Sequence, residues 1–313
     1  MVAAVVLFLT LFLSYFAKVS WFFDLFTHFR FQYLIASLVL LVIFTSLRKG
    51  FFIGFSIFLV AANIFLATEN IVFVPKKSES QTSRTLTIVQ YNRLLLNFDH
   101  EIVKNWLVEN AERFDVVVLQ EANAKLSRTA EQVHHKYPYQ VLKARNDAFG
   151  IIILSRIKPK EYQEISIPGP LFRNMAIRVV IRPEGFEQDV AIYALHAMPP
   201  MDKEQQEQRN FELKTVALEI VKDETERRIM VGDWNLTPYS PFFYKLLKES
   251  GLQRQSTHLI PLPTWPSVLL PWAMQIPIDH VLVDPSLTII KEERENSMGS
   301  DHYPLVASFI ESP

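Results

Sequence analysis

Three uninterrupted apolar runs open the chain. They cover Met1–Ala17, Phe31–Leu47 and Phe51–Thr68, and none contains a charged residue. Each approaches the roughly 20 helical residues that cross about 30 Å of hydrocarbon. Three such runs within 70 residues have almost no polar face to present in a soluble domain, so the pattern predicts three membrane-spanning helices. The alternatives are a buried core helix for any single run and a signal peptide for the first.

A different pattern follows a polar, Ser- and Thr-rich stretch at Pro75–Thr85. Short apolar runs predict strands that begin near residues 86, 115, 150, 175, 189, 228, 278 and 305. Amphipathic or polar stretches predict helices over 99–112, 202–222 and 241–250, with Asp99 as the cap of the first. We therefore expect a membrane anchor over 1–74, a linker over 75–85 and an α/β domain over 86–311 with a two-layer sheet core flanked by helices.

Charge and cysteine content narrow the function. Only four of the 32 basic and two of the 33 acidic residues lie in the first 70, so the remainder carries 28 and 31, a net charge of −3. This balance disfavours a protein that grips long nucleic acid through phosphate neutralisation, and no stable nucleic-acid complex is expected. The absence of cysteine excludes disulfides, zinc–thiolate sites and a cysteine nucleophile.

Polar side chains interrupt the predicted strands at their ends. Each strand is apolar until its last or first residues, where a carboxylate, amide or imidazole appears. These residues are Asn92, Glu121, His196, Asp233, Asn235, Asp279, His280, Asp301 and His302. One such residue alone indicates a turn or a helix cap. Together they predict a site outside the strand ends.

This combination of residue types suits phosphoester hydrolysis. Carboxylate and amide oxygens are the ligands that Mg²⁺ or Mn²⁺ prefers. A carboxylate or histidine is needed to orient and deprotonate a water molecule. Asn and His are suitable donors to the non-bridging oxygens, where charge collects in the transition state.

The order and spacing of these residues resemble the endonuclease/exonuclease/phosphatase superfamily, which includes deoxyribonuclease I, exonuclease III-type nucleases, neutral sphingomyelinases and inositol polyphosphate 5-phosphatases. The resemblance covers about residues 85–311. It rests on Tyr91-Asn92, Leu119-Gln-Glu121, Leu195-His196-Ala-Met-Pro199, Gly232-Asp-Trp-Asn235, Ile278-Asp279-His and Ser300-Asp-His-Tyr-Pro304. Thr264-Trp265-Pro266 is also similar to a bacterial branch of YafD-type, membrane-anchored proteins.

The resemblance implies a DNase I-like, four-layered α/β sandwich with two mixed β-sheets. It also implies roles for the polar residues. Glu121 would be the principal ligand of Mg²⁺ or Mn²⁺, with Asn92 and Asp301 beside it. Among the catalytic residues, His302 would act as the general base or contact the phosphate, and Asp279 would hold it. Asp233 would align or deprotonate the water. Asn235 would contact the phosphate, and His196 would hydrogen-bond the phosphate or assist the leaving group.

Five further residues have no firm assignment. Trp234 stands where the family usually has Phe, which we expect to be tolerated. Arg93 follows Asn92, where an apolar residue is more typical, so it either contacts phosphate or is solvated. Arg145, Arg173 and Asn174 are candidate substrate contacts or plain surface residues, and no partner that orients His196 is evident.

The side of the membrane follows from two conflicting signals. A raw count of basic residues, two against five, favours a cytoplasmic domain. The three-residue turn Arg48-Lys49-Gly50 is the more compact cytoplasmic signal, and relatives with three spans and such a turn hold the domain outside. We therefore expect a multi-pass protein of a bacterial inner membrane with an extracytoplasmic catalytic domain.

The expected partners are the lipid bilayer and a phosphoester substrate, either a phospholipid head group or a small phosphoester. An apolar stretch over 265–274 offers a lipid contact, or is a packed loop. The alternative functions are a nuclease and a catalytically inactive, membrane-tethered binding protein.

Overall fold

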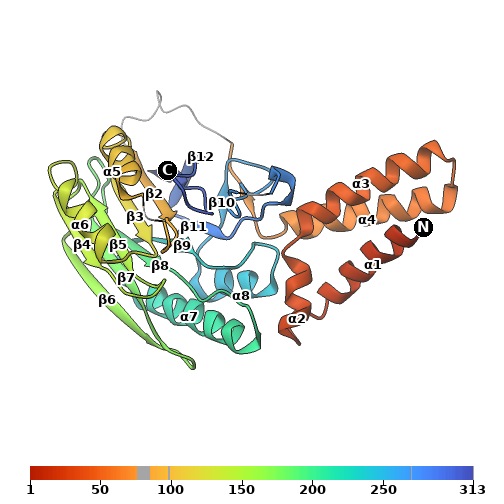
Figure 1. The fold of residues 1–313 in the computed structure, drawn as a ribbon, viewed down its shortest axis with the longest axis horizontal. Coiled ribbons are helices and arrows are strands. Elements are labelled where there is room, and N and C mark those ends of the chain that lie inside the picture. The colour runs from red at the N-terminus through yellow and green to blue at the C-terminus, as the bar shows by residue number, and fades with distance from the viewer. Residues whose placement is uncertain (76–84, 98, 269, 313) are drawn as a thin grey trace.

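The computed structural model describes residues 1–75, 85–97, 99–268 and 270–312. Two β-sheets form the centre of its globular part, and helices flank them (Figure 1). The six-stranded sheet has the order β12-β13-β2-β3-β5-β4, and the five-stranded sheet has the order β11-β9-β8-β7-β6. Each contains one parallel pair, β2 with β3 and β8 with β9, among antiparallel neighbours. The prediction of an α/β fold with two mixed sheets is therefore confirmed.

The strands of the six-stranded sheet are β2 (Leu86–Asn92), β3 (Val116–Gln120), β4 (Tyr139–Lys143), β5 (Ile151–Ser155), β12 (Leu287–Arg294) and β13 (Leu305–Glu311). Those of the five-stranded sheet are β6 (Glu161–Pro168), β7 (Arg173–Ile181), β8 (Val190–Leu195), β9 (Arg227–Asp233) and β11 (Asp279–Val283). The flanking helices are α5 (His100–Glu109), α6 (Ala124–Gln132), α7 (Lys203–Lys222) and α8 (Pro241–Ser250), and a short 3₁₀ helix, η3, spans Trp272–Met274.

The burial of both sheet faces explains why the central strands are continuously apolar. One cluster, which includes Ile88, Val118 and Ile192, fills the space between the sheets. A second cluster covers the outer face of the six-stranded sheet and includes Trp106 of α5. A third covers the outer face of the five-stranded sheet with residues of α7 and α8, such as Val216. Strands covered on both sides lose the alternation of polar and apolar residues.

Helix starts follow the sequence signals. Asp99 accepts a hydrogen bond from the Ile102 backbone N–H at 3.1 Å, which confirms its predicted capping role at α5. Helix α6 and the strands β4, β6 and β12 had no counterpart in the prediction, and the three strands all lie at sheet edges. Helix α6 has nine residues with few apolar ones, and edge strand β6 is mostly exposed.

The N-terminal helices differ from the prediction of three spans. Helix α4 (Gly50–Thr68) is long and apolar enough to cross a membrane, and α3 (Arg30–Ser46) qualifies only together with the preceding Trp21–Thr27 segment, from which it is bent by 57°. Helix α1 (Val2–Ser14) has 13 residues, about 20 Å at 1.5 Å per residue. The described residues thus offer at most one or two candidate spans. The prediction of three spans was wrong because the first helix is too short to cross a membrane.

The N-terminal unit is fastened to the globular part. Strand β1 (Val72–Phe73) pairs in parallel with β10 (Gln255–Ser256), and Asn70 Nδ2 donates to the Pro238 carbonyl at 2.8 Å. Residues 76–84, most of the predicted linker, lie outside the described residues. The segment between α1 and α3 consists of α2 (Trp21–Asp24) and a 3₁₀ turn, η1 (Leu25–Thr27), and its Asp24 is bonded to residues of the globular part.

Candidate active site

The two sheets bring their polar strand ends to one place. Asn92 is the last residue of β2 and Glu121 follows β3, so the parallel pair delivers both at the same edge of the six-stranded sheet. Asp233 ends β9 and Asp279 begins β11, and antiparallel pairing makes them direct cross-strand partners in the five-stranded sheet. Asp301 and His302 precede β13.

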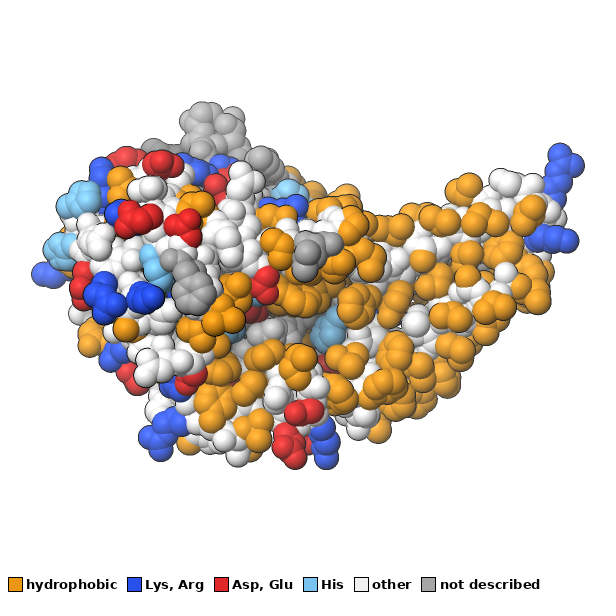
Figure 2. Space-filling model, viewed as in Figure 1, with side chains coloured by type: hydrophobic (Ala, Val, Ile, Leu, Met, Phe, Trp, Pro, Cys, Tyr) orange, Lys and Arg blue, Asp and Glu red, His pale blue; other side chains and the backbone are white. Residues whose placement is uncertain are grey.

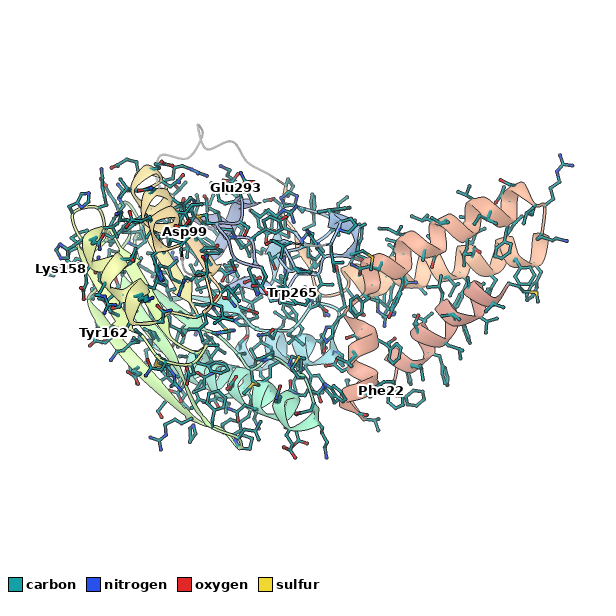
Figure 3. All side chains as sticks on the ribbon, in the orientation of Figure 1. Phe22, Asp99, Lys158, Tyr162, Trp265 and Glu293 are labelled. Atoms are coloured by element: carbon teal, nitrogen blue, oxygen red, sulfur yellow. The ribbon has the colours of Figure 1, made fainter. Side chains whose placement is uncertain are left out.

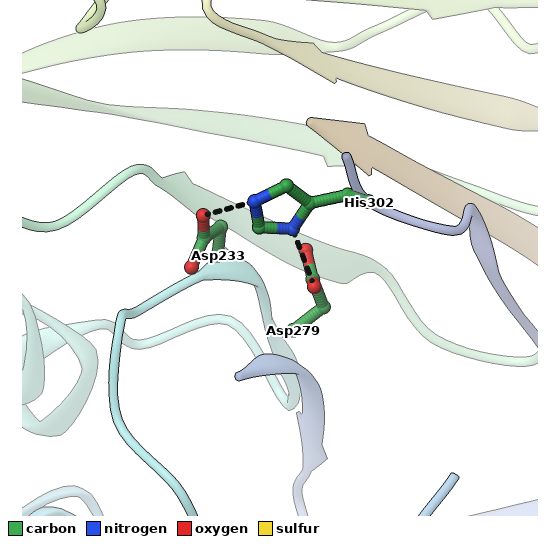
Figure 4. A group of neighbouring side chains, drawn as sticks. All are labelled: Asp233, Asp279 and His302. Atoms are coloured by element: carbon green, nitrogen blue, oxygen red, sulfur yellow. Dashed lines mark hydrogen bonds and ion pairs between the residues drawn. The ribbon is translucent and has the colours of Figure 1, made fainter. Parts of the chain in front are cut away.

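Asp233, Asp279 and His302 form a buried cluster (Figure 4). The Nδ1 atom of His302 lies 2.9 Å from Asp279 Oδ2, and Nε2 lies 3.6 Å from Asp233 Oδ2. Burial alone would lower the pKa of His302, but the carboxylates of Asp279 and Asp233 outweigh it and raise this pKa to about 10. Burial raises the pKa of Asp233 to about 6 although His302 opposes it. The three residues offer ligand atoms within 4.8 Å of one another and could hold a metal ion.

A second group of oxygens lies beside this cluster. Asn92 Nδ2 donates to Glu121 Oε1 and to Asp233 Oδ2, both at 2.9 Å. Glu121 has a left-handed backbone with φ of 54°, and its Oε2 accepts from the Leu95 N–H at 2.6 Å. Asp301 Oδ2 accepts from the Trp265 indole at 2.9 Å, whereas its Oδ1 is buried without a hydrogen-bond partner.

His196 and Asn235 complete the set. His196 follows β8, its Nδ1 lies 2.8 Å from the Ala148 carbonyl oxygen, and its Nε2 lies 3.5 Å from Asp233 Oδ2. This carbonyl is the orienting partner that the sequence did not reveal. Asn235 has a φ of 49°, and its Nδ2 donates to the Ala197 carbonyl at 3.0 Å.

One cleft of about 610 Å³ unites most of the predicted site. Seven of the eight predicted residues line it: Asn92, Glu121, His196, Asp233, Asn235, Asp301 and His302. Asp279 lies behind His302. Trp265 also lines the cleft, in the part of the globular domain nearest the N-terminal helices (Figure 3).

Several buried amides support the site, and this supporting role was not predicted from the sequence. Gln90 Nε2 crosses from the six-stranded sheet to Asp279 Oδ1 at 2.7 Å, and Gln120 Nε2 donates to the Leu195 carbonyl at 2.8 Å. Both interrupt apolar strands just before the polar ends, which is the signal that could have found them. Asn174 is fully buried and donates to the His196 carbonyl and to Glu212, so it is a support and not a substrate contact.

The other weighed residues lie away from the cleft lining. Arg93 is neither solvated nor among the lining residues: it is buried and donates to the Asn97 carbonyl. Arg145 pairs with Asp147 at 2.6 Å, and Arg173 is exposed on β7. In the apolar stretch over 265–274, Leu269 lies outside the described residues, while Val268, Leu270, Trp272 and Met274 are exposed.

Comparisons with known proteins agree with this arrangement. The chain is similar in structure to TDP2 of D. rerio complexed with single-strand DNA product (TM-score 0.57, 19% identity, 72% of this chain and 99% of that one). It is also similar to sphingomyelinase C from Streptomyces griseocarneus (TM-score 0.54, 17% identity, 72% and 99%) and to an endonuclease/exonuclease/phosphatase protein from Beutenbergia cavernae DSM 12333 (TM-score 0.55, 18% identity, 73% and 72%). These likenesses show a shared fold.

The search of curated proteins finds no match. In contrast, the sequence pattern of the endonuclease/exonuclease/phosphatase family matches residues 89–302, which is more than half of the chain and runs from β2 to His302. The chain therefore belongs to the endonuclease/exonuclease/phosphatase family.

Proposed function

We propose that this protein is a membrane-anchored, divalent-metal-dependent phosphoesterase. The observation that carries the proposal is the convergence of Glu121, Asp233 and Asp301, two histidines and two amides on one cleft, with an Asp301 oxygen left without a donor. Members of this family hydrolyse phosphoesters with metal ions. In this chain, the apolar N-terminal helices add a membrane anchor to the family's domain.

The donor set fits a hard cation. A buried carboxylate oxygen with no hydrogen-bond partner costs free energy unless a cation or water satisfies it, and Asp301 Oδ1 is such an atom. Together with Glu121 and Asn92 it offers oxygen ligands, which Mg²⁺ and Mn²⁺ prefer. We assign these three to the ion in place of the Asp233–Asp279–His302 cluster, because His302 is already engaged by Asp279. The bound ion would neutralise charge on the phosphate.

The protein's own groups divide the remaining tasks. His302 is held by Asp279, which fixes the ring and leaves Nε2 toward Asp233, so this pair is suited to move a proton to or from water or phosphate. Asp233 lies within 3.6 Å of both histidines' Nε2 atoms and orients the water. His196, fixed by the Ala148 carbonyl, and Asn235 face the cleft as contacts of the phosphate oxygens.

The N-terminal helices support the membrane anchor. Hydrophobic side chains cover the helical projection, and basic residues stand at its far end (Figure 2). That end is the turn between α3 and α4, which holds Arg48 and Lys49. Basic residues favour the cytoplasmic side. We therefore place the globular domain outside the cytoplasm, as in the YafD-like branch.

The substrate is a phosphoester, either a phospholipid head group or a small extracytoplasmic phosphoester. The test uses the full chain in lipid nanodiscs with bis-p-nitrophenyl phosphate, p-nitrophenyl phosphate, phospholipids and plasmid DNA, each with Mg²⁺, Mn²⁺ or EDTA. Turnover is expected with metal and lost in Glu121→Ala, while Glu131→Ala, an exposed carboxylate on α6, retains it. Folded protein without metal-dependent turnover of any substrate would overturn the enzyme proposal in favour of a tethered binding protein, and preference for plasmid DNA would make it a nuclease.

A further inference from the structure

One wall of the cleft comes from outside the catalytic domain. Leu25 and His28 belong to the segment that joins α1 to α3, and Phe29 immediately precedes α3. All three line the cleft that contains the catalytic side chains. We refer to Leu25, His28 and Phe29 as the N-terminal wall.

The N-terminal wall is fixed in place by its neighbours. The Trp21 indole donates to the Pro200 carbonyl at 2.7 Å, and His28 Nδ1 lies 2.9 Å from Thr237 Oγ1. Between them, Asp24 forms a fully buried ion pair with Arg209 at 3.2 Å. Bonds on both sides of Leu25 hold this segment against the globular part, where it lines the cleft.

The chemistry of the lining discriminates between substrate classes. Away from the catalytic residues, the cleft is lined mainly by apolar side chains: Leu25, Phe29, Phe149, Met198, Met201 and Ile276. Among the described residues that line it, none is Lys or Arg. Beyond the catalytic histidines, a polyanion such as nucleic acid or a polyphosphate would therefore find no lysine or arginine in the lining, whereas a single phosphate with an apolar substituent matches both parts of the cleft.

The position of the wall connects the cleft to the anchor. Phe29 is 38% exposed at the start of α3, and the adjoining Phe31 packs against Trp272 with ring centroids 5.0 Å apart. Trp272, in η3 just before β11, is itself 48% exposed. An apolar path therefore runs from the cleft to the helices whose exposed surface is hydrophobic (Figure 2).

We propose that the N-terminal wall is a substrate subsite for the apolar part of an amphiphilic phosphoester drawn from the bilayer, with the phosphate at the catalytic side chains. This inference rests on the proposed function and names its substrate class. It assigns to the anchor a role in selecting the substrate in addition to tethering the domain.

The test measures binding, so that it does not depend on turnover. Methyl phosphate and octyl phosphate are titrated by calorimetry into the full chain in nanodiscs with Mg²⁺, with empty nanodiscs as blank. Three methylene groups covered by the wall would tighten binding about 50-fold, equal to about 2.4 kcal/mol. The octyl-to-methyl affinity ratio should fall in Leu25→Ser and Phe29→Ser and recover in Phe29→Leu.

Phe22→Ser is the matched control, because Phe22 lies on α2 and is 52% exposed but does not line the cleft. Its affinity ratio should equal that of the wild type. Equal affinities for the two phosphates, or a ratio that the wall variants leave unchanged, would overturn the inference. Metal- and Glu121-dependent hydrolysis of bis-p-nitrophenyl phosphate in the same preparation would then leave the proposed function standing, so the two failures are distinguishable.

Discussion

The buried ion pair between Asp24 and Arg209 joins the N-terminal unit to the globular domain, and substitution of either residue removes it. The Asp24 carboxylate is 2% and the Arg209 side chain 0% exposed. Asp24 also accepts from Ser240 Oγ at 2.7 Å, and Arg209 Nη1 donates to the Asn235 carbonyl at 3.2 Å. Removing one partner of such a pair leaves a charge buried without compensation, which costs about 3–5 kcal/mol.

We therefore expect Asp24→Asn and Arg209→Met each to lower the free energy of unfolding by about 3–5 kcal/mol. The double variant should be less destabilised than the sum by about 2 kcal/mol, because the second change removes the charge that the first one stranded. Hydrolysis should fall as well, since Arg209 holds the loop that carries Asn235. Denaturant unfolding of the full chain in a fixed detergent, followed by tryptophan fluorescence, measures these values.

The pair Lys203–Glu207 is the control. It lies on the same chain segment as Arg209, in α7, but its side chains are 78% and 56% exposed at 3.7 Å. Exposed pairs at this spacing contribute about 0.3–0.5 kcal/mol. A coupling energy for Asp24 and Arg209 no larger than that of this control would refute the reasoning, because it would mean that the interface is hydrated or open in solution.

Two further predictions concern buried polar side chains, Gln90 beside Asp279 and His280 beside the Leu236 carbonyl. Gln90→Leu removes a donor that lowers the pKa of Asp279, so the acid limb of the pH–rate profile should move to higher pH with about a tenfold loss of kcat. Gln120 is an equally buried amide that is bonded to backbone, so Gln120→Leu should leave the acid limb in place. Equal pH–rate profiles for the two variants would contradict the role of Gln90. Burial lowers the pKa of His280 to about 3, below its unfolded value near 6.5, so the unfolded state gains the proton first and stability should fall as pH drops below about 6.5, by up to about 1.4 kcal/mol per pH unit. Between pH 7 and 5, the free energy of unfolding should fall less steeply with pH in His280→Gln than in the wild type. Identical pH dependence in the two proteins would show that His280 is solvated.

Much of the globular domain could be predicted from the sequence because the signals that indicate its strands and helices are local. Continuous apolar runs such as Val116–Leu119 identified strands buried on both faces, and Asp99 marked the start of α5. The polar residues at strand ends identified seven of the lining residues of the cleft, because strand ends in two facing sheets converge. Helix α6 and the edge strands β4, β6 and β12 were not predicted, and α6 and β6 carry too few apolar residues to produce a period.

The supports of the site depended on packing between distant segments. Gln90 meets Asp279 across 189 residues, and the Ala148 carbonyl meets His196 across 48. Neither contact has a sequence spacing that reveals it, because the sheets face each other only after folding. The same holds for Arg93, whose charge suggested phosphate or solvent but whose burial places it against backbone carbonyls.

The N-terminal unit shows most clearly which features a local sequence pattern reveals and which depend on tertiary contacts. Hydropathy by itself determined that the first 70 residues form apolar helices, because that property is additive along the chain. Hydropathy overestimated the number of spans, since helix α1 ends at Ser14 and the Trp21–Thr27 segment packs on the globular domain. Only the tertiary structure decided that Asp24 meets Arg209, 185 residues away, and that Leu25 and Phe29 close one side of the cleft. Such contacts depend on shape and charge complementarity between folded surfaces, which no local pattern in a single sequence encodes.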